Sequence, residues 1–106
     1  MSLDPSTVTP LDRLVTAAAG DVASGVLLKA GGGSATLFAV AEGAGLAEHA
    51  TPREALFTVL DGTAEVDLDG TTHTVQSGEA IRFPAGAPHA VRARSDLRFL
   101  LVLLRT

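Results

Sequence analysis

The stretch GEAIRFPAGAPH, residues 78–89, decides the fold of this chain. It contains a short β-like run, Glu79–Phe83, followed by a turn rich in proline and glycine over residues 84–88. Proline fixes φ and glycine tolerates positive φ, so this composition predicts a tight turn that returns the chain into a neighbouring strand. That next strand is predicted over His89–Ala93.

Other short β-like runs lie on both sides of this stretch, separated by turn residues. The pairs Asp61-Gly62 and Asp69-Gly70 each lie between two such runs, where Asp-Gly is a strong hairpin signal. Many short strands at regular spacing indicate an all-β sandwich or barrel. The predicted strands are Val26–Lys29, Thr36–Ala41, Leu56–Leu60, Thr63–Asp69, Thr72–Gln76, Glu79–Phe83, His89–Ala93 and Leu97–Leu104.

The last run, Leu97–Leu104, is apolar on both of its faces apart from Arg98. A strand that is apolar on both sides has to be covered on both sides. We therefore expect it to lie inside the fold or under a partner subunit.

The N-terminal part of the chain has a different pattern. Thr9, Pro10 and Asp12 fit the start of a helix, and apolar residues then follow at helical spacing until Gly20. The expected organisation is an arm with one short helix over residues 1–24 and a β domain over residues 25–106.

Composition limits the function classes. The chain has 106 residues, 46% of them hydrophobic, which suits one domain with a core. Its net charge is −4 with no basic run, so nucleic-acid binding is not expected. Its apolar runs are much shorter than the roughly 20 residues that cross a bilayer. Without a recognisable signal sequence, the default expectation is a soluble cytoplasmic protein with no membrane partner.

Two segments carry a family resemblance. The fixed positions Gly78, Pro84, Gly86 and His89 resemble the second conserved motif of the cupin superfamily. Upstream, residues 43–62 resemble the first motif less completely. The resemblance implies a small cupin-type antiparallel β-barrel, jelly-roll-like, which with the short N-terminal helix is the expected fold class.

The first motif departs from the family pattern at two ligand positions. Gly43, His49 and Gly62 fit it, whereas Thr51 replaces a histidine and Ala55 replaces a glutamate. In cupins with both motifs intact, these positions and the histidine of the second motif bind a divalent metal. Carried over by position, the resemblance leaves an incomplete metal site for Fe, Mn, Ni or Zn at two histidines, His49 and His89.

These departures favour a binding protein over a metalloenzyme. The primary hypothesis is a pocket that binds a small molecule through His49, Thr51, Phe57 and His89, without a complete metal-ligand set. The alternative is a metal-dependent cupin enzyme of the dioxygenase, isomerase or decarboxylase type that uses His49 and His89. A metal-free variant would use the two imidazoles for proton transfer.

Two further expectations concern the remaining features. His73 has no neighbouring ligand residues in a recognisable pattern and is interpreted as structural. Cupin-like barrels commonly pair, so the resemblance implies a homodimer. A purely structural or regulatory dimer is a third hypothesis.

Overall fold

The computed structural model describes residues 2–105, and within this range the chain forms nine β-strands and no α-helix. No helix in the described range is therefore long and apolar enough to span a membrane. The strands are β1 Val22–Ala30, β2 Gly33–Val40, β3 Gly45–His49, β4 Glu54–Asp61, β5 Thr63–Leu68, β6 Thr71–Gln76, β7 Ala80–Phe83, β8 His89–Ala93 and β9 Leu97–Leu104.

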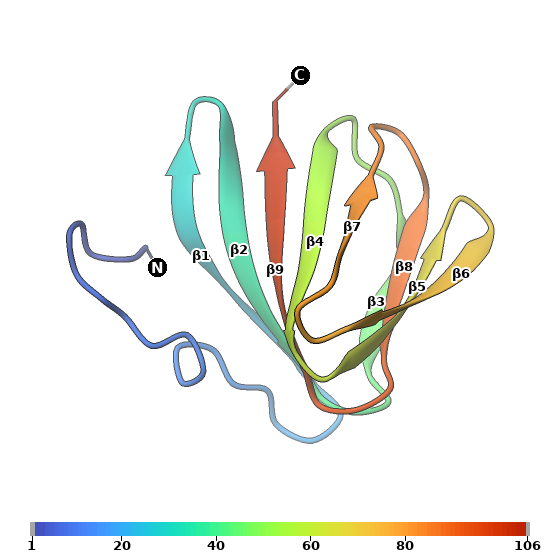
Figure 1. The fold of residues 1–106 in the computed structure, drawn as a ribbon, viewed down its shortest axis with the longest axis horizontal. Helices are drawn as coiled ribbons and strands as arrows, with labels where there is room; N and C mark the ends of the chain where they lie inside the picture. Colours follow the sequence, from blue (N-terminus) through green and yellow to red (C-terminus); the bar gives the residue numbers. More distant parts are fainter. Residues whose placement is uncertain (1, 106) are drawn as a thin grey trace.

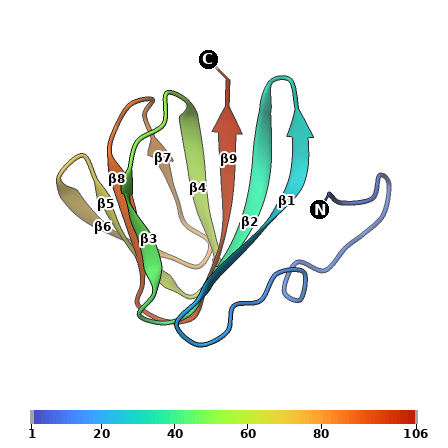
Figure 2. The ribbon, with the colours of Figure 1, turned by 180° about the vertical axis from the view of Figure 1, so that it is seen from behind.

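The strands form two antiparallel sheets, with the orders β1-β2-β9-β4-β7 and β3-β8-β5-β6. Figure 1 shows the five strands of the first sheet side by side, and Figure 2 shows the second sheet from behind. The all-β expectation is confirmed, but the expected closed barrel is not present. Within the described residues, the edge strands of one sheet do not pair with those of the other, so the architecture is a sandwich of two sheets.

The core lies between the inner faces of the two sheets. It is built almost entirely from alternate residues of the strands, because side chains on a strand point to opposite faces in turn. β9 runs between β2 and β4, which places one of its faces in this core and explains half of its apolar pattern. The fully buried large side chains of this core are Phe57, Phe83, Phe99, Val40, Val59, Val66 and Val91. Leu37 is also fully buried, but under the N-terminal arm on the outer face of the five-stranded sheet.

The predicted N-terminal helix is wrong. Residues 11–15 form turns, and the arm packs its apolar side chains, including Val15, against the outer face of the five-stranded sheet. The Leu3 amide donates a hydrogen bond to the Leu27 carbonyl of β1. A helix of about ten residues is marginal by itself, and here the same apolar residues are buried without one. β1 begins at Val22, slightly before the predicted domain start.

One of the two predicted Asp-Gly hairpins is confirmed and the other is wrong. Asp69 and Gly70 both adopt positive φ, at 49° and 85°, and join the paired strands β5 and β6. Asp61 and Gly62 instead connect β4 and β5, which belong to different sheets. A Cβ atom on Gly62 would lie 2.1 Å from the Asp96 carbonyl oxygen, so glycine there permits a close approach of two chain segments.

Candidate functional site

The structure brings His49 and His89 together across two neighbouring strands. The two residues are register partners in the β3–β8 pair, at the ends of their strands. Their Nε2 atoms lie 3.1 Å apart, and their ring centroids lie 4.3 Å apart with the rings inclined at 64°. Two residues forty positions apart in sequence thus present the same ring nitrogen to a common point.

An irregularity in β3 makes this approach possible. Leu46 pairs with Val91 and His49 pairs with His89, so three steps along β3 match two steps along β8. A bulge of one residue reverses the alternation of faces. Without it Glu48, which shares the parity of Leu46, would face the interior. The bulge places His49 there instead.

The other ring nitrogen of each histidine is already bound. His49 Nδ1 lies 2.9 Å from the Ala47 carbonyl oxygen, and His89 Nδ1 lies 3.1 Å from the Ala87 carbonyl oxygen. A carbonyl only accepts hydrogen bonds, so we assign the proton of each neutral ring to Nδ1. Both Nε2 atoms then carry a lone pair, and the lone pairs face each other. This arrangement can share one proton between the rings, or accept a hydrogen-bond donor that approaches both nitrogens from the cavity side.

The four phenylalanines of the chain form a series of contacting rings that leads from this histidine pair into the core. Phe83 stacks on His89, and Phe57 links Phe83 to Phe99, which stacks in turn on Phe38. The centroid separations between successive rings are 4.4 to 5.5 Å. The stack is therefore a continuous apolar wall that ends at an imidazole.

A cavity of about 50 Å³ lies against this wall. Its lining is apolar except for the two imidazoles, which form its polar end. The lining residues are Phe38, Leu46, His49, Phe57, Phe83, His89, Val91, Phe99 and Leu101. The interior is narrow, and any molecule that enters it meets hydrocarbon on most sides and imidazole at one end.

The two histidines differ in exposure. His89 is only 3% exposed, whereas His49 is exposed at the outer end of the cavity. Burial lowers the pKa of His89; the Ala87 carbonyl partly offsets this, and the neighbouring His49 lowers it further. His89 is therefore kept neutral in neutral solution.

The donor set does not fit a resident catalytic metal of the family type. Such sites normally have three protein ligands, and no group of three or more His, Cys, Asp or Glu side chains gathers in the described range. The Thr51 hydroxyl accepts a hydrogen bond from the Arg53 amide, and Thr51 does not line the cavity. Ala55 is buried on β4 and offers no ligand atom. We derive no reaction step through a metal.

Of the predicted ligand-binding residues, the structure places His49, Phe57 and His89 around the cavity and Thr51 outside it. His73 lies apart from them, in an open groove beside the turn at residues 84–88. The other three phenylalanines also line the cavity, and the sequence had not led us to expect them there. Strand alternation could have indicated two of them as inward-facing residues. Phe83 lies on the same face of its strand as Ile81, and Phe99 lies on the same face as Leu97.

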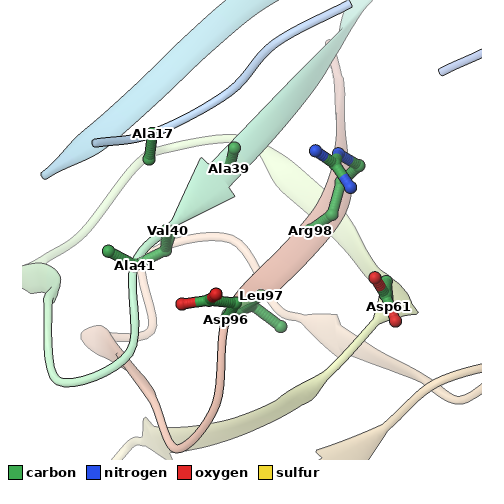
Figure 3. A pocket seen from close by; sticks show the side chains of 8 residues that line it. All are labelled: Ala17, Ala39, Val40, Ala41, Asp61, Asp96, Leu97 and Arg98. Atoms are coloured by element: carbon green, nitrogen blue, oxygen red, sulfur yellow. The ribbon is translucent and has the colours of Figure 1, made fainter. Parts of the chain in front are cut away.

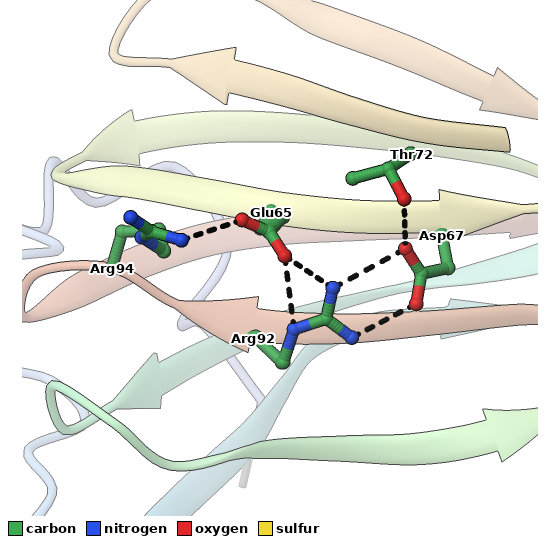
Figure 4. A network of polar contacts seen from close by, with 5 residues as sticks. All are labelled: Glu65, Asp67, Thr72, Arg92 and Arg94. Atoms are coloured by element: carbon green, nitrogen blue, oxygen red, sulfur yellow. Dashed lines mark hydrogen bonds and ion pairs between the residues drawn. The ribbon is translucent and has the colours of Figure 1, made fainter.

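The largest polar cluster lies away from this site, on the outer face of the four-stranded sheet (Figure 4). Arg92 forms ion pairs with Glu65 and Asp67, and Arg94 pairs with Glu65. The pKa values of Glu65 and Asp67 are lowered, mainly because both carboxylates accept hydrogen bonds from Arg92. The two positive and two negative charges pair with one another. We therefore interpret the cluster as a contact that links neighbouring strands, and not as a binding site.

Comparisons with known proteins agree with this architecture. A conserved protein of unknown function from Streptococcus pyogenes is 30% identical, with a TM-score of 0.90 over 98% of this chain and 91% of that chain. A cupin superfamily protein from Desulfitobacterium hafniense is 23% identical, with a TM-score of 0.90 over 98% and 95% of the two chains. A predicted oxalate decarboxylase from Thermotoga maritima is 17% identical, with a TM-score of 0.76 over 80% of each chain.

No curated protein matches the chain. The profile of the family described as "Cupin domain" matches residues 36–103, which span β2 to β9 except for their outermost residues. This range includes both histidines of the site and the whole aromatic stack. The chain belongs to the cupin family.

Proposed function

We propose that this cupin domain binds a small molecule in its interior cavity, with one polar group of that molecule held against the Nε2 atoms of His49 and His89. The observation that carries the proposal is the 3.1 Å separation of the two Nε2 atoms at the end of an apolar cavity. Apolar walls exclude water and a few polar groups fix orientation, as in other small-molecule sites. No metal is needed for this mode of binding.

The geometry limits what the molecule can be. A volume of about 50 Å³ holds about three to five water-sized groups. The two facing lone pairs call for a hydrogen-bond donor, because an acceptor placed there would be repelled. A short hydrocarbon that carries one hydroxyl or N–H group satisfies both conditions.

The same geometry supports a second candidate function, proton transfer without a metal. The lowered pKa of His89 keeps its Nε2 free to accept a proton in neutral solution. His49 adjoins that atom and could receive or return the proton. The expected metal-dependent dioxygenase, isomerase or decarboxylase activity gains no support from Thr51 and Ala55.

The binding proposal is tested with two probes of nearly equal shape, isopropanol and acetone. Isopropanol donates a hydrogen bond through its hydroxyl group, whereas acetone only accepts. We expect isopropanol to shift the side-chain NMR signals of His49 and His89 at lower concentration than acetone does. Equal responses to both probes, or no response, would contradict the proposal.

Variants localise the effect. His49→Leu removes one Nε2 atom at an exposed position, and should weaken isopropanol binding about ten-fold, the value of a hydrogen bond lost in an apolar site. His73→Leu is the matched control, since His73 does not line the cavity. Binding that survives His49→Leu unchanged would place the alcohol elsewhere.

We also propose the homodimer that the resemblance implies. Leu56 and Leu104 are 44% and 52% exposed on β4 and β9, and both lie on the face opposite the core, where a second copy could cover them. Light scattering coupled to size-exclusion chromatography reports the mass directly. The cytoplasmic location stays a prediction.

A further inference from the structure

A second cavity lies outside the sandwich, between the N-terminal arm and the ends of β2, β4 and β9. It has a volume of about 120 Å³. Its apolar lining includes Ala17 of the arm and Ala39 and Leu97 of the sheet (Figure 3). Its charged lining is Asp61, Asp96 and Arg98. None of these residues contributes to the histidine site.

Arg98 carries an unsatisfied donor here. One terminal nitrogen of its guanidinium donates a hydrogen bond to the Val15 carbonyl at 3.1 Å. Its Nε atom is buried, and it is the one buried side-chain nitrogen or oxygen without a partner in the described part of the chain. A buried charged donor without an acceptor is costly, and native proteins rarely leave one. The donor is therefore open to an acceptor from outside the chain, whether solvent or a ligand.

The two carboxylates lie on the other side of the hollow. Figure 3 shows Asp61 and Asp96 at the lower margin of the cavity and the Arg98 guanidinium at its upper margin. Asp61 is the register partner of Arg98 across β4 and β9, yet no ion pair joins either carboxylate to Arg98 within residues 2–105. Asp96 accepts a hydrogen bond from the Glu42 amide through Oδ1. Opposite charges thus face a common space without neutralising each other.

We propose that this cavity binds a small zwitterion, specifically a small α-amino acid. Its carboxylate would accept hydrogen bonds from Arg98, including the Nε–H donor, and its ammonium group would lie between Asp61 and Asp96. A guanidinium binds a carboxylate through parallel donors, and the short Ala39 side chain leaves room for a small substituent. The volume admits about eight to twelve water-sized groups, which excludes large ligands.

The test uses the full chain labelled with ¹⁵N and three probes: glycine, acetate and methylammonium. Glycine carries both charges, and each of the other probes carries one. We expect glycine to shift the amide signals of Ala17, Ala39 and Ala41 at lower concentration than either single-charge probe. An equal response to acetate would show an anion site, and an equal response to methylammonium a cation site; each would overturn the zwitterion assignment, as would no response to glycine.

Three variants check the assigned roles. Arg98→Lys keeps the charge but removes Nε, and should weaken glycine binding about ten-fold or more. Asp61→Asn changes an exposed carboxylate with no assigned contact, and should weaken glycine binding about two- to five-fold while leaving acetate unchanged. Arg82→Lys, at an exposed ion pair with Glu54, is the control.

Arg98→Lys also removes a contact to the arm, so its effect is interpreted together with Asp61→Asn, which leaves the arm intact. Unchanged glycine affinity in both variants would overturn the proposal. The amide spectrum of each variant, compared with that of the unmodified chain for residues outside this cavity, checks independently that the variant is folded.

Discussion

Phe83 stacks on the imidazole of His89, with ring centroids 4.4 Å apart and the planes inclined at 24°. The phenyl ring covers one face of the imidazole with hydrocarbon and leaves it no polar partner on that side. Together with the low exposure of His89, this contact favours the neutral form of the ring. The stack thus connects the apolar core directly to the chemistry of the site.

The first prediction concerns stability and pH. The pKa of His89 is lowered in the folded protein, so between pH 7 and its folded pKa the unfolded chain binds more protons. The free energy of unfolding should be highest above about pH 6.5, the ordinary histidine value, and should fall as the pH decreases below it. Urea denaturation at a series of pH values measures this slope. His89→Leu should flatten it, while His73→Leu should not; equal slopes in all three proteins would contradict the assignment.

The second prediction concerns the aromatic stack. Phe83→Ala removes a fully buried ring between His89 and Phe57 and leaves a larger cavity. Unfolding free energy should fall by about 3–5 kcal/mol, as for other buried phenylalanines. Val8→Ala, at a position that is 99% exposed, is the control and should cost much less. A loss for Phe83→Ala no greater than that of the control would show that the stack does not stabilise the fold.

The third prediction compares two glycines with nearly the same φ. Gly62 and Gly70 have φ of 86° and 85°, but a Cβ atom on Gly70 meets no atom within 4 Å. Gly70→Ala should therefore cost about 1–2 kcal/mol from the backbone conformation alone. Gly62→Ala adds the collision with the Asp96 carbonyl and should cost clearly more. Thermal unfolding of the two variants measures both losses of stability. Equal losses would mean that the segments around Gly62 and Asp96 move apart at no cost to accept the added Cβ atom.

The fourth prediction concerns the two altered motif positions. Thr51→His combined with Ala55→Glu restores the ligand types of the family motif at these two positions, neither of which lines the cavity in the unmodified chain. The double variant should bind zinc or manganese more tightly than either single variant, because it raises the number of ligand side chains from two to four. Metal analysis of untagged protein after incubation and desalting measures the gain. A double variant without that gain would show that Thr51 and Ala55 do not occupy ligand positions.

The strands were the most predictable part of the fold. The turn at residues 84–88 and the strands on either side of it follow from local alternation and turn residues, and the last strand matches Leu97–Leu104. The Asp61-Gly62 prediction failed because a local signal cannot show which strand a segment pairs with. The helix prediction failed because the sheet surface, which is not visible in local sequence, buries the same apolar residues.

The candidate site was predictable in its histidines and less so in its surroundings. The motif resemblance selected His49 and His89, whose convergence depends on a bulge that sequence alternation does not reveal. Thr51 was expected in the pocket as the residue at a ligand position of the first motif, but it lies in the irregular segment between β3 and β4, which turns it away from the cavity. The cavity at Arg98 depends on how the arm lies against the sheet, a tertiary arrangement that local sequence patterns do not specify.

The protonation of the two imidazoles tests the central claim most directly. A long-range ¹H–¹⁵N NMR spectrum of metal-free protein, recorded at a pH where both rings are neutral, reports which nitrogen of each ring carries the proton. We predict a protonated Nδ1 and an unprotonated Nε2 in both His49 and His89. A proton on Nε2 of either neutral ring would remove the facing lone pairs and contradict the proposed binding site.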